Sequence, residues 1–162
     1  MFNVRSTQRV LFLDPGVGGT GWAYYRNVDG GDYNLPTTGV VFPKGATWQA
    51  KVRTVMASMS GVLSLYRPIL VVAEFPRVWQ EATSHASATR GDLFKLAYLV
   101  GALDRACEAL DMGTVQLISP SDWKGQLPKD ALKRRVEKLL GVSYQDHELD
   151  AVGMGLAAMG RL

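Results

Sequence analysis

Two apolar segments of the sequence each end in a carboxylate. Residues 9–14 (RVLFLD) end at Asp14, and the apolar part of residues 69–75 (ILVVAEF) leads into Glu74. A charge at the end of a buried strand is costly unless it faces a cleft or a cation. Because neighbouring strands lie about 4.8 Å apart, two such carboxylates can share one metal ion or a pair of ions. Each residue alone has another interpretation, in which Asp14 forms a turn and Glu74 pairs with Arg77.

A further candidate set lies near the C-terminus, in residues 147–150 (HELD). His147 and Asp150 are three residues apart, so on a helix they project from the same side and form a chelating face. Residues 151–160 are mostly small, which allows a helix to lie close against a sheet and to bring Asp150 to the strand ends. Alternatively, Asp146 and Asp150 only complement the N-terminus of the helix.

Basic residues are concentrated between Lys124 and Lys138. This segment contains six lysines and arginines but only two carboxylates, so its net charge is +4. This segment includes a helix that opens at Pro128 and closes at Gly141. Its charge is sufficient to attract a polyanion. The same pattern is also typical of the solvated face of an amphipathic helix.

The elements that position these residues follow from the apolar periodicity. We expect strands at residues 9–14, 21–26, 38–42, 69–75 and 114–118. Helices are expected from the N-cap Thr47 to a stop before Pro68, from the cap Asp92 to a stop before Gly113, between Pro128 and Gly141, and at residues 146–159. The first three strands form an antiparallel meander, and the whole order predicts an α/β layered domain.

Length and composition set the class of protein. The 162 residues include 47% hydrophobic and 20% charged residues, which is typical of one soluble domain spanning residues 1–162. The net charge is only +3, and the single cysteine, Cys107, cannot form an internal disulfide, which favours a reducing compartment. No apolar segment reaches the ~20 residues of a membrane span, and the N-terminus does not resemble a signal peptide. We therefore expect a cytoplasmic protein without membrane contact.

Taken together, the chain resembles the RuvC-type Holliday junction resolvases of the ribonuclease H-like superfamily. The landmarks are Leu13-Asp14-Pro15-Gly16 with Thr20-Gly21, Val72-Ala73-Glu74, the segment Ser119-Pro120-Ser121-Asp122-Trp123-Lys124, the helix start Pro128-Lys129, and His147-x-x-Asp150-Ala151. They occur in the family's order along nearly the whole chain. The resemblance implies a ribonuclease H-like α/β fold whose five-stranded mixed sheet has three antiparallel and two parallel strands, flanked by helices.

By this resemblance, Asp14, Glu74, His147 and Asp150 are metal ligands at a site for two Mg²⁺ or Mn²⁺ ions. Many family members have Asp in place of His147, and an imidazole ligand favours Mn²⁺. Lys124 and Lys129 are implied to act in catalysis by holding backbone phosphates. The other implied DNA contacts are Phe75, Arg77, Trp79, Arg90 and Lys133. Phe75 and Trp79 are candidates for an aromatic at the junction crossover, although Arg77 stands at the spacing from Glu74 where the family has it.

The implied activity is a crossover junction endodeoxyribonuclease, a homodimer that resolves four-way junction DNA by paired symmetric nicks. Departures from the bacterial pattern slightly favour a phage source. Two alternatives remain open: another ribonuclease H-like nuclease acting on flaps, forks or RNA–DNA hybrids, and a branched-DNA-binding module without catalysis. An actin-type kinase needs a second domain that 162 residues do not supply. A proofreading exonuclease needs an acid where this chain has Gly16.

Overall fold

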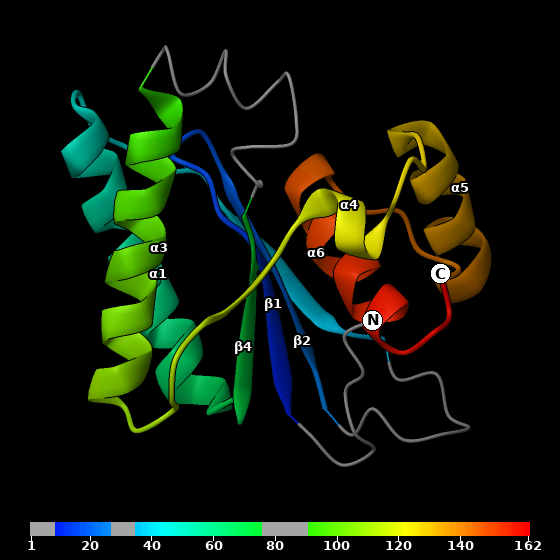
Figure 1. Ribbon diagram of the computed structural model, residues 1–162, viewed down its shortest axis with the longest axis horizontal. Helices are drawn as coiled ribbons and strands as arrows, with labels where there is room; N and C mark the ends of the chain where they lie inside the picture. Colours follow the sequence, from blue (N-terminus) through cyan, green and yellow to red (C-terminus); the bar gives the residue numbers. More distant parts are fainter. Residues whose placement is uncertain (1–8, 27–34, 76–90) are drawn as a thin grey trace.

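The computed structural model describes residues 9–26, 35–75 and 91–162. In the described residues, three strands come first, then helices alternate with two further strands, and three helices follow the last strand (Figure 1). The strands are β1 (Val10–Asp14), β2 (Thr20–Tyr25), β3 (Thr37–Val41), β4 (Leu70–Glu74) and β5 (Gln116–Ile118). The helices are α1 (Trp48–Tyr66), α3 (Asp92–Ala109), α4 (Pro120–Trp123), α5 (Lys129–Leu140) and α6 (Asp146–Ala158). The predicted strands and longer helices are confirmed with small shifts of their ends, whereas the short helix α4 is not predicted from the sequence.

The strands form one five-stranded sheet in the order β3-β2-β1-β4-β5. β1 pairs antiparallel with β2, and β2 with β3, while β4 runs parallel to β1 and to β5. This is the mixed sheet that the sequence predicts. Because β1 and β4 are parallel neighbours, their C-terminal ends lie side by side at the same end of the sheet.

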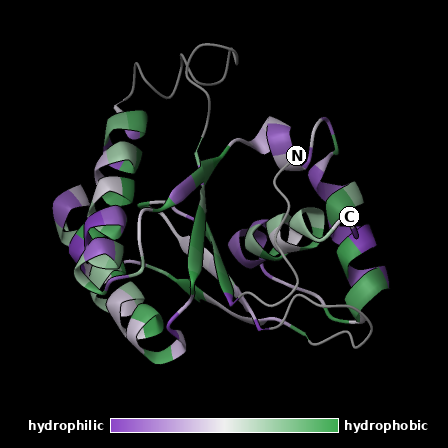
Figure 2. Cartoon of the chain, turned by 60° about the horizontal axis from the view of Figure 1, so that its bottom comes forward, coloured by the Kyte–Doolittle hydropathy of each residue, from purple (hydrophilic) through white to green (hydrophobic). Residues whose placement is uncertain are grey.

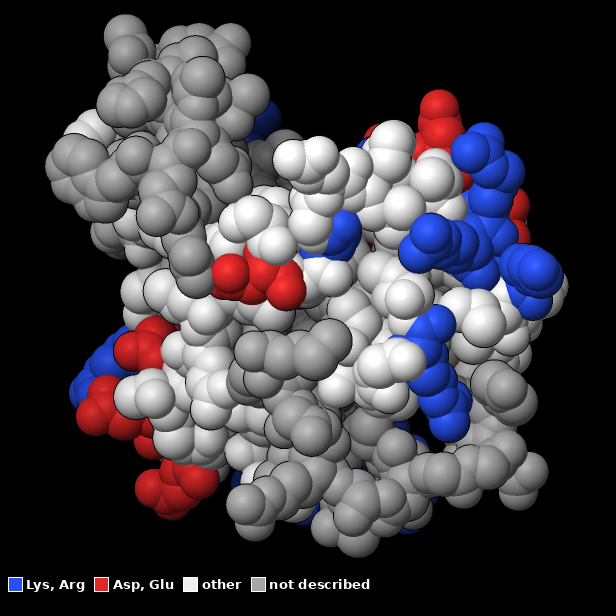
Figure 3. Space-filling model, turned by 45° about the vertical axis from the view of Figure 1, so that its right-hand side comes forward, with Lys and Arg blue, Asp and Glu red and all other residues white. Residues whose placement is uncertain are grey.

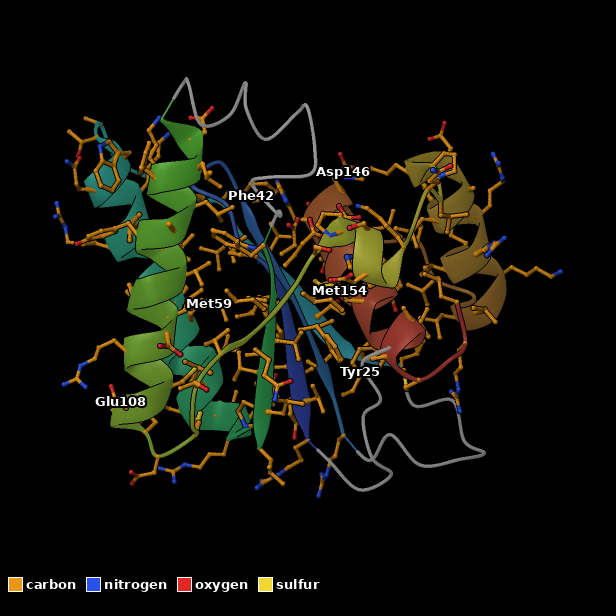
Figure 4. All side chains as sticks on the ribbon, viewed as in Figure 1. Tyr25, Phe42, Met59, Glu108, Asp146 and Met154 are labelled. Atoms are coloured by element: carbon orange, nitrogen blue, oxygen red, sulfur yellow. The ribbon has the colours of Figure 1, made fainter. Side chains whose placement is uncertain are left out.

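Helices cover both faces of the sheet, as Figure 1 shows. On one face Leu11 and Leu13 pack towards α1 and α3, and on the other Val10 and Phe12 pack towards α6. The neighbouring strands β1 and β4 are accordingly hydrophobic up to the carboxylates that end them (Figure 2). Met59 and Met154, labelled in Figure 4, belong to the two separate cores. A sheet buried on both faces explains why β1 has no polar alternation before Asp14.

Local signals explain most helix ends. The side chain of Thr47 accepts a hydrogen bond from the backbone N–H of Ala50, as an N-cap does. Gly141 closes α5 in the left-handed conformation, with φ 68°. The predicted cap Asp92 is instead the first helical residue, because Gly91 occupies the N-cap position and Asp92 pairs with Lys95 in the first turn. Within the described ranges, no helix is long and apolar enough to cross a membrane.

Candidate active site

Asp14 and Glu74 are the last residues of β1 and β4, two parallel neighbours in the sheet. The register pairs Leu13 with Ala73, so that the two carboxylates follow at the same level. Both are half-buried. The apolar residues of both strands are packed in the core and hold the backbone in place. Only the terminal residue of each strand, Asp14 or Glu74, carries a charge at this end of the sheet. The structure therefore brings these two predicted residues together.

Helix α6 delivers His147 to the same edge. Its Nδ1 lies 2.7 Å from Oδ2 of Asp14. The close approach depends on Gly21 in β2, where a Cβ atom would overlap the backbone carbonyl of His147. A Cβ at Gly19 would come within 2.7 Å of the imidazole ring. The prediction that small residues allow the helix to pack closely against the sheet is thus confirmed. The small residues lie in and before β2 as well as in α6.

The first turn of α6 is also held by hydrogen bonds. Oγ1 of Thr38 in β3 donates to Oε1 of Glu148 at 3.1 Å, and Oε2 of Glu148 accepts from the backbone N–H of Gln145. Gln145 and Glu148 form a capping box at the start of the helix. Glu148 therefore anchors the helix to the sheet while His147 and Asp150 face the strand ends.

Asp150 is buried and lies between two lysines. Its Oδ2 is 3.1 Å from Nζ of Lys129, and its Oδ1 is 3.5 Å from Nζ of Lys124. Lys129 also lies 3.5 Å from Asp146, which is labelled in Figure 4 at the start of α6. Burial lowers the pKa of Lys129, but Asp150 and Asp146 raise it more, so that the net shift is upward. Both predicted lysines thus belong to the same cluster as the carboxylates.

Trp123 is a site residue to which sequence reasoning assigned no role. Its indole Nε1 donates a hydrogen bond of 2.7 Å to Oε2 of Glu74. The short helix α4, with a capping box between Ser119 and Asp122, sets the position of this side chain. Its ring packs closely against Gly153 of α6. The available signal was its place directly before Lys124 in the motif that resembles the family.

The electrostatics of the edge reflect the crowding of acidic groups. Burial, and then repulsion by Asp14, raise the pKa of Glu74 to about 7. The hydrogen bond to Asp14 raises the pKa of His147 above its ordinary value, although burial opposes the shift. Mutual repulsion between carboxylates favours any cation that binds between them.

The donor set fits hard or borderline divalent cations, since it combines three carboxylates with an imidazole. Among the described residues, no three His, Cys, Asp or Glu side chains converge on a single point. Their donor atoms are instead engaged in pairs: Asp14 with His147, Glu74 with Trp123, and Asp150 with the two lysines. The four residues themselves sit at the ends of β1 and β4 or on one turn of α6.

The predicted DNA contacts are only partly described. Phe75 is half-buried just after β4, and its backbone N–H donates to the carbonyl of Ile118. Lys133 is exposed on α5. In Figure 3, which brings the α5 side of the molecule forward, Lys and Arg side chains gather towards that side. Arg77, Trp79 and Arg90 lie outside the described residues.

Comparison with solved structures identifies the fold. The chain is similar to RuvC of Thermus thermophilus at 20% identity and a TM-score of 0.69, with 91% of each chain covered. It is equally similar to T. thermophilus RuvC in complex with a Holliday junction substrate, over 95% of this chain and 97% of that one. The yeast mitochondrial Holliday junction resolvase matches at 14% identity and a TM-score of 0.63, over 96% of this chain and 79% of that one. No protein-family model and no curated protein matches the sequence. The chain therefore has the ribonuclease H-like fold of the RuvC-type resolvases, as its sequence predicts.

Proposed function

We propose that the protein is a metal-dependent, structure-selective DNA endonuclease that resolves Holliday junctions by paired symmetric nicks. The observation that carries this proposal is the gathering of Asp14, Glu74, His147 and Asp150 at one sheet edge. The fold supports it, because the similar structures are Holliday junction resolvases, one of them in complex with its junction substrate.

Asp14, Glu74, His147 and Asp150 would hold two Mg²⁺ or Mn²⁺ ions. Bound there, the ions supply an activated water and charge stabilisation at the leaving oxygen of the phosphodiester. Other residues of the chain hold the proposed metal ligands in position. Trp123 fixes the carboxylate of Glu74 through its 2.7 Å hydrogen bond, and Glu148 fixes the helical turn that carries His147 and Asp150.

Lys124 and Lys129 bind phosphate oxygens of the substrate in this proposal. Their ammonium groups lie beside Asp150, and the Lys129 side chain is 45% exposed, so it can reach a ligand at the edge. Lys133 continues the basic surface along α5, where a duplex arm would lie. These contacts hold the DNA backbone without reading its sequence.

We also propose that the active form is a homodimer, because two symmetric nicks need two sites related by a two-fold axis. The outer face of α3 is suited to this contact. Phe94 and Tyr98 are 73% and 59% exposed, and Gly101 follows one turn later.

Cleavage of an end-labelled four-way junction tests the activity. Linear duplex, a fork and an RNA–DNA hybrid are the comparison substrates, each in Mg²⁺, in Mn²⁺ and in chelator. We expect paired nicks on the junction alone with either metal, and none with Asp14→Asn. Because Asn has nearly the shape of Asp, the variant should fold and still bind the junction.

The other results of this assay point to different functions. Cleavage of the hybrid or the fork in preference to the junction would assign the site to another ribonuclease H-like nuclease. Junction binding without cleavage in either metal would indicate a binding module. Cleavage that survives Asp14→Asn would contradict the proposed site itself.

A further inference from the structure

A concave site lies at the end of the sheet opposite Asp14 and Glu74. It is a cavity of about 490 Å³ between the start of β1, the end of β2, the start of β3 and the last turn of α1. Tyr25, labelled in Figure 4, marks this end of the sheet. The five residues of β1 separate the cavity from Asp14 by about 16 Å. The cavity is therefore distinct from the candidate active site.

Two arginines line this cavity. β1 pairs Val10 with Tyr25, and extending this antiparallel register by one residue sets Arg9 opposite Arg26, just beyond the two strands. Both lie on the face of the sheet that Leu11 and Tyr24 share, which faces α1. Like charges directly opposite on neighbouring strands destabilise a sheet. Among the described residues, no carboxylate forms an ion pair with either arginine, so within that part of the chain their charge is left to a bound anion or to solvent.

The rest of the lining is aromatic, apolar and hydroxylated. Tyr24 and Tyr66 stack with their ring centroids 4.7 Å apart, and Thr37 pairs with Tyr24 across β2 and β3. Leu35 and Leu65 complete the wall, and they are 53% and 74% exposed. Exposed leucines next to two guanidinium groups suit a ligand with an apolar ring at one end and an anion at the other.

We propose that this cavity binds the phosphate of a nucleotide. Arg9 and Arg26 would take the phosphate, since guanidinium groups bind phosphate oxygens in a bidentate manner. The base would lie against Leu65 and the edge of the tyrosine stack. The volume is within the range of small-ligand pockets and is too small for a duplex. The shared chemistry admits two sources, a free nucleotide or the 5′-phosphorylated end of a DNA strand.

Calorimetric titration of the full chain in chelator tests this site without reference to cleavage. The probes are thymidine 5′-monophosphate, inorganic phosphate, thymidine, and a short oligothymidylate with and without a 5′-phosphate. We expect the monophosphate to bind, inorganic phosphate to bind more weakly and thymidine not to bind. The strand end is the source if the phosphorylated oligonucleotide binds more tightly than the mononucleotide, and the free nucleotide is the source if it does not.

Variants locate the binding. Arg9→Gln/Arg26→Gln should weaken binding of the monophosphate by about tenfold or more. Leu65→Glu places a carboxylate on the wall at an exposed helical position, so it should weaken binding without risk to the sheet. Arg53→Gln, an exposed arginine elsewhere on α1, should leave the affinity unchanged. A loss of binding in Lys124→Gln/Lys129→Gln alone would place the ligand at the candidate active site instead.

Two outcomes would overturn the proposal. One is the absence of binding by the wild type at millimolar monophosphate. The other is an affinity that Leu65→Glu and the double arginine variant leave unchanged, or that only the lysine variant reduces. If the double arginine variant unfolds, Leu65→Glu alone decides between the cavity and a purely structural role of the arginine pair. Since the readout is binding, a failure of the nuclease proposal does not affect the result.

Discussion

Glu74 occupies an environment that opposes its ionisation. Burial and the nearby Asp14 raise its pKa from 4.5 in the unfolded chain to about 7. Folding therefore favours the protonated form, and this contribution to stability is complete below about pH 4.5 and is lost as the pH rises through 7. His147 adds an effect of the same sign, because its pKa is also raised. The metal-free protein should thus be less stable at neutral pH than in mild acid.

The substitution Glu74→Gln should remove most of this loss. The amide stays neutral at all pH values and can still accept the hydrogen bond from Trp123. In chelator at about pH 8, we expect the variant to exceed the wild type in unfolding free energy by on the order of 3 kcal/mol at most. The difference should vanish near pH 4.5.

Thermal unfolding followed by circular dichroism across this pH range measures the effect. Glu108→Gln is the matched control, because Glu108 is exposed on α3 (labelled in Figure 4) and should give no such gain. A Glu74→Gln protein that tracks the wild type at every pH would show that the carboxylate is not under electrostatic strain.

Sequence reasoning at the residue scale found the acidic groups but not their immediate partners. Asp14 and Glu74 stand out because each interrupts an apolar strand, a signal contained within a few residues. Trp123 donates to Glu74 across 49 positions of sequence, so no local pattern indicates the contact. Thr20, fully buried and bonded to Gly16, is likewise indistinguishable from an ordinary strand threonine before the turn is seen.

At the scale of elements, α6 depends on glycines that let it lie against β2. A Cβ at Gly155 would overlap the ring of Tyr25, whose hydroxyl donates to the carbonyl of Val152. Gly155→Ala should therefore destabilise the protein by roughly 1–3 kcal/mol through overpacking. Gly61→Ala on the exposed side of α1 meets nothing within 4 Å and should stabilise by roughly 0.5–1 kcal/mol.

Chemical denaturation measures both changes in the glycine pair. Replacing glycine by alanine raises helix propensity in both helices. A loss of stability in Gly155→Ala and a gain in Gly61→Ala would therefore show the effect of packing against the sheet. Equal stabilisation by both alanines would mean that α6 does not depend on close approach at Gly155.

Helix α5 presents its charges to solvent on the side opposite α1. Lys133 and Arg134 are exposed in its middle, while Leu132 and Val136 face the core. If these cations neutralise phosphates, Lys133→Gln/Arg134→Gln should weaken junction binding and reduce the slope of log affinity against log salt by about 0.9 for each phosphate that is no longer neutralised. Arg53→Gln on α1 should leave the slope unchanged. Binding titrations at several salt concentrations, in chelator, provide the comparison.

Element prediction succeeded where the periodicity was long and failed where an element was short. β1, β4 and α1 carry several apolar positions each, and caps such as Thr47 mark their ends. Helix α4 spans four residues, too few to show a period, and it forms because Ser119 and Asp122 cap it and Trp123 is buried. This short helix positions the partner of Glu74, so the least predictable element carries part of the site.

The sheet divides the molecule into two sides, each covered by its own helices. α5 and α6 lie on one side, and α1 and α3 on the other (Figure 1). On the proposed function, DNA and the second protomer would contact different sides. Tyr98→Glu should then give a monomer that binds the junction but nicks one strand at a time.

Light scattering and the ratio of single to paired nicks test this separation. Ser60→Glu, an exposed change on α1, serves as the control and should leave both readouts as in the wild type. A dimer that persists in Tyr98→Glu would place the protomer contact elsewhere.

Gly21 carries no reactive group, yet the site leaves no room for a side chain there. Even the methyl of alanine would push the first turn of α6 away from β2 and move His147 and Asp150 together. Gly18, only three residues earlier, has open space around it. In a library selected for junction cleavage, Gly21 would accept substitutions as rarely as Asp14, whereas Gly18 would vary freely. Low tolerance to substitution in this chain would thus mark positions where a helix contacts a strand as well as positions with reactive side chains.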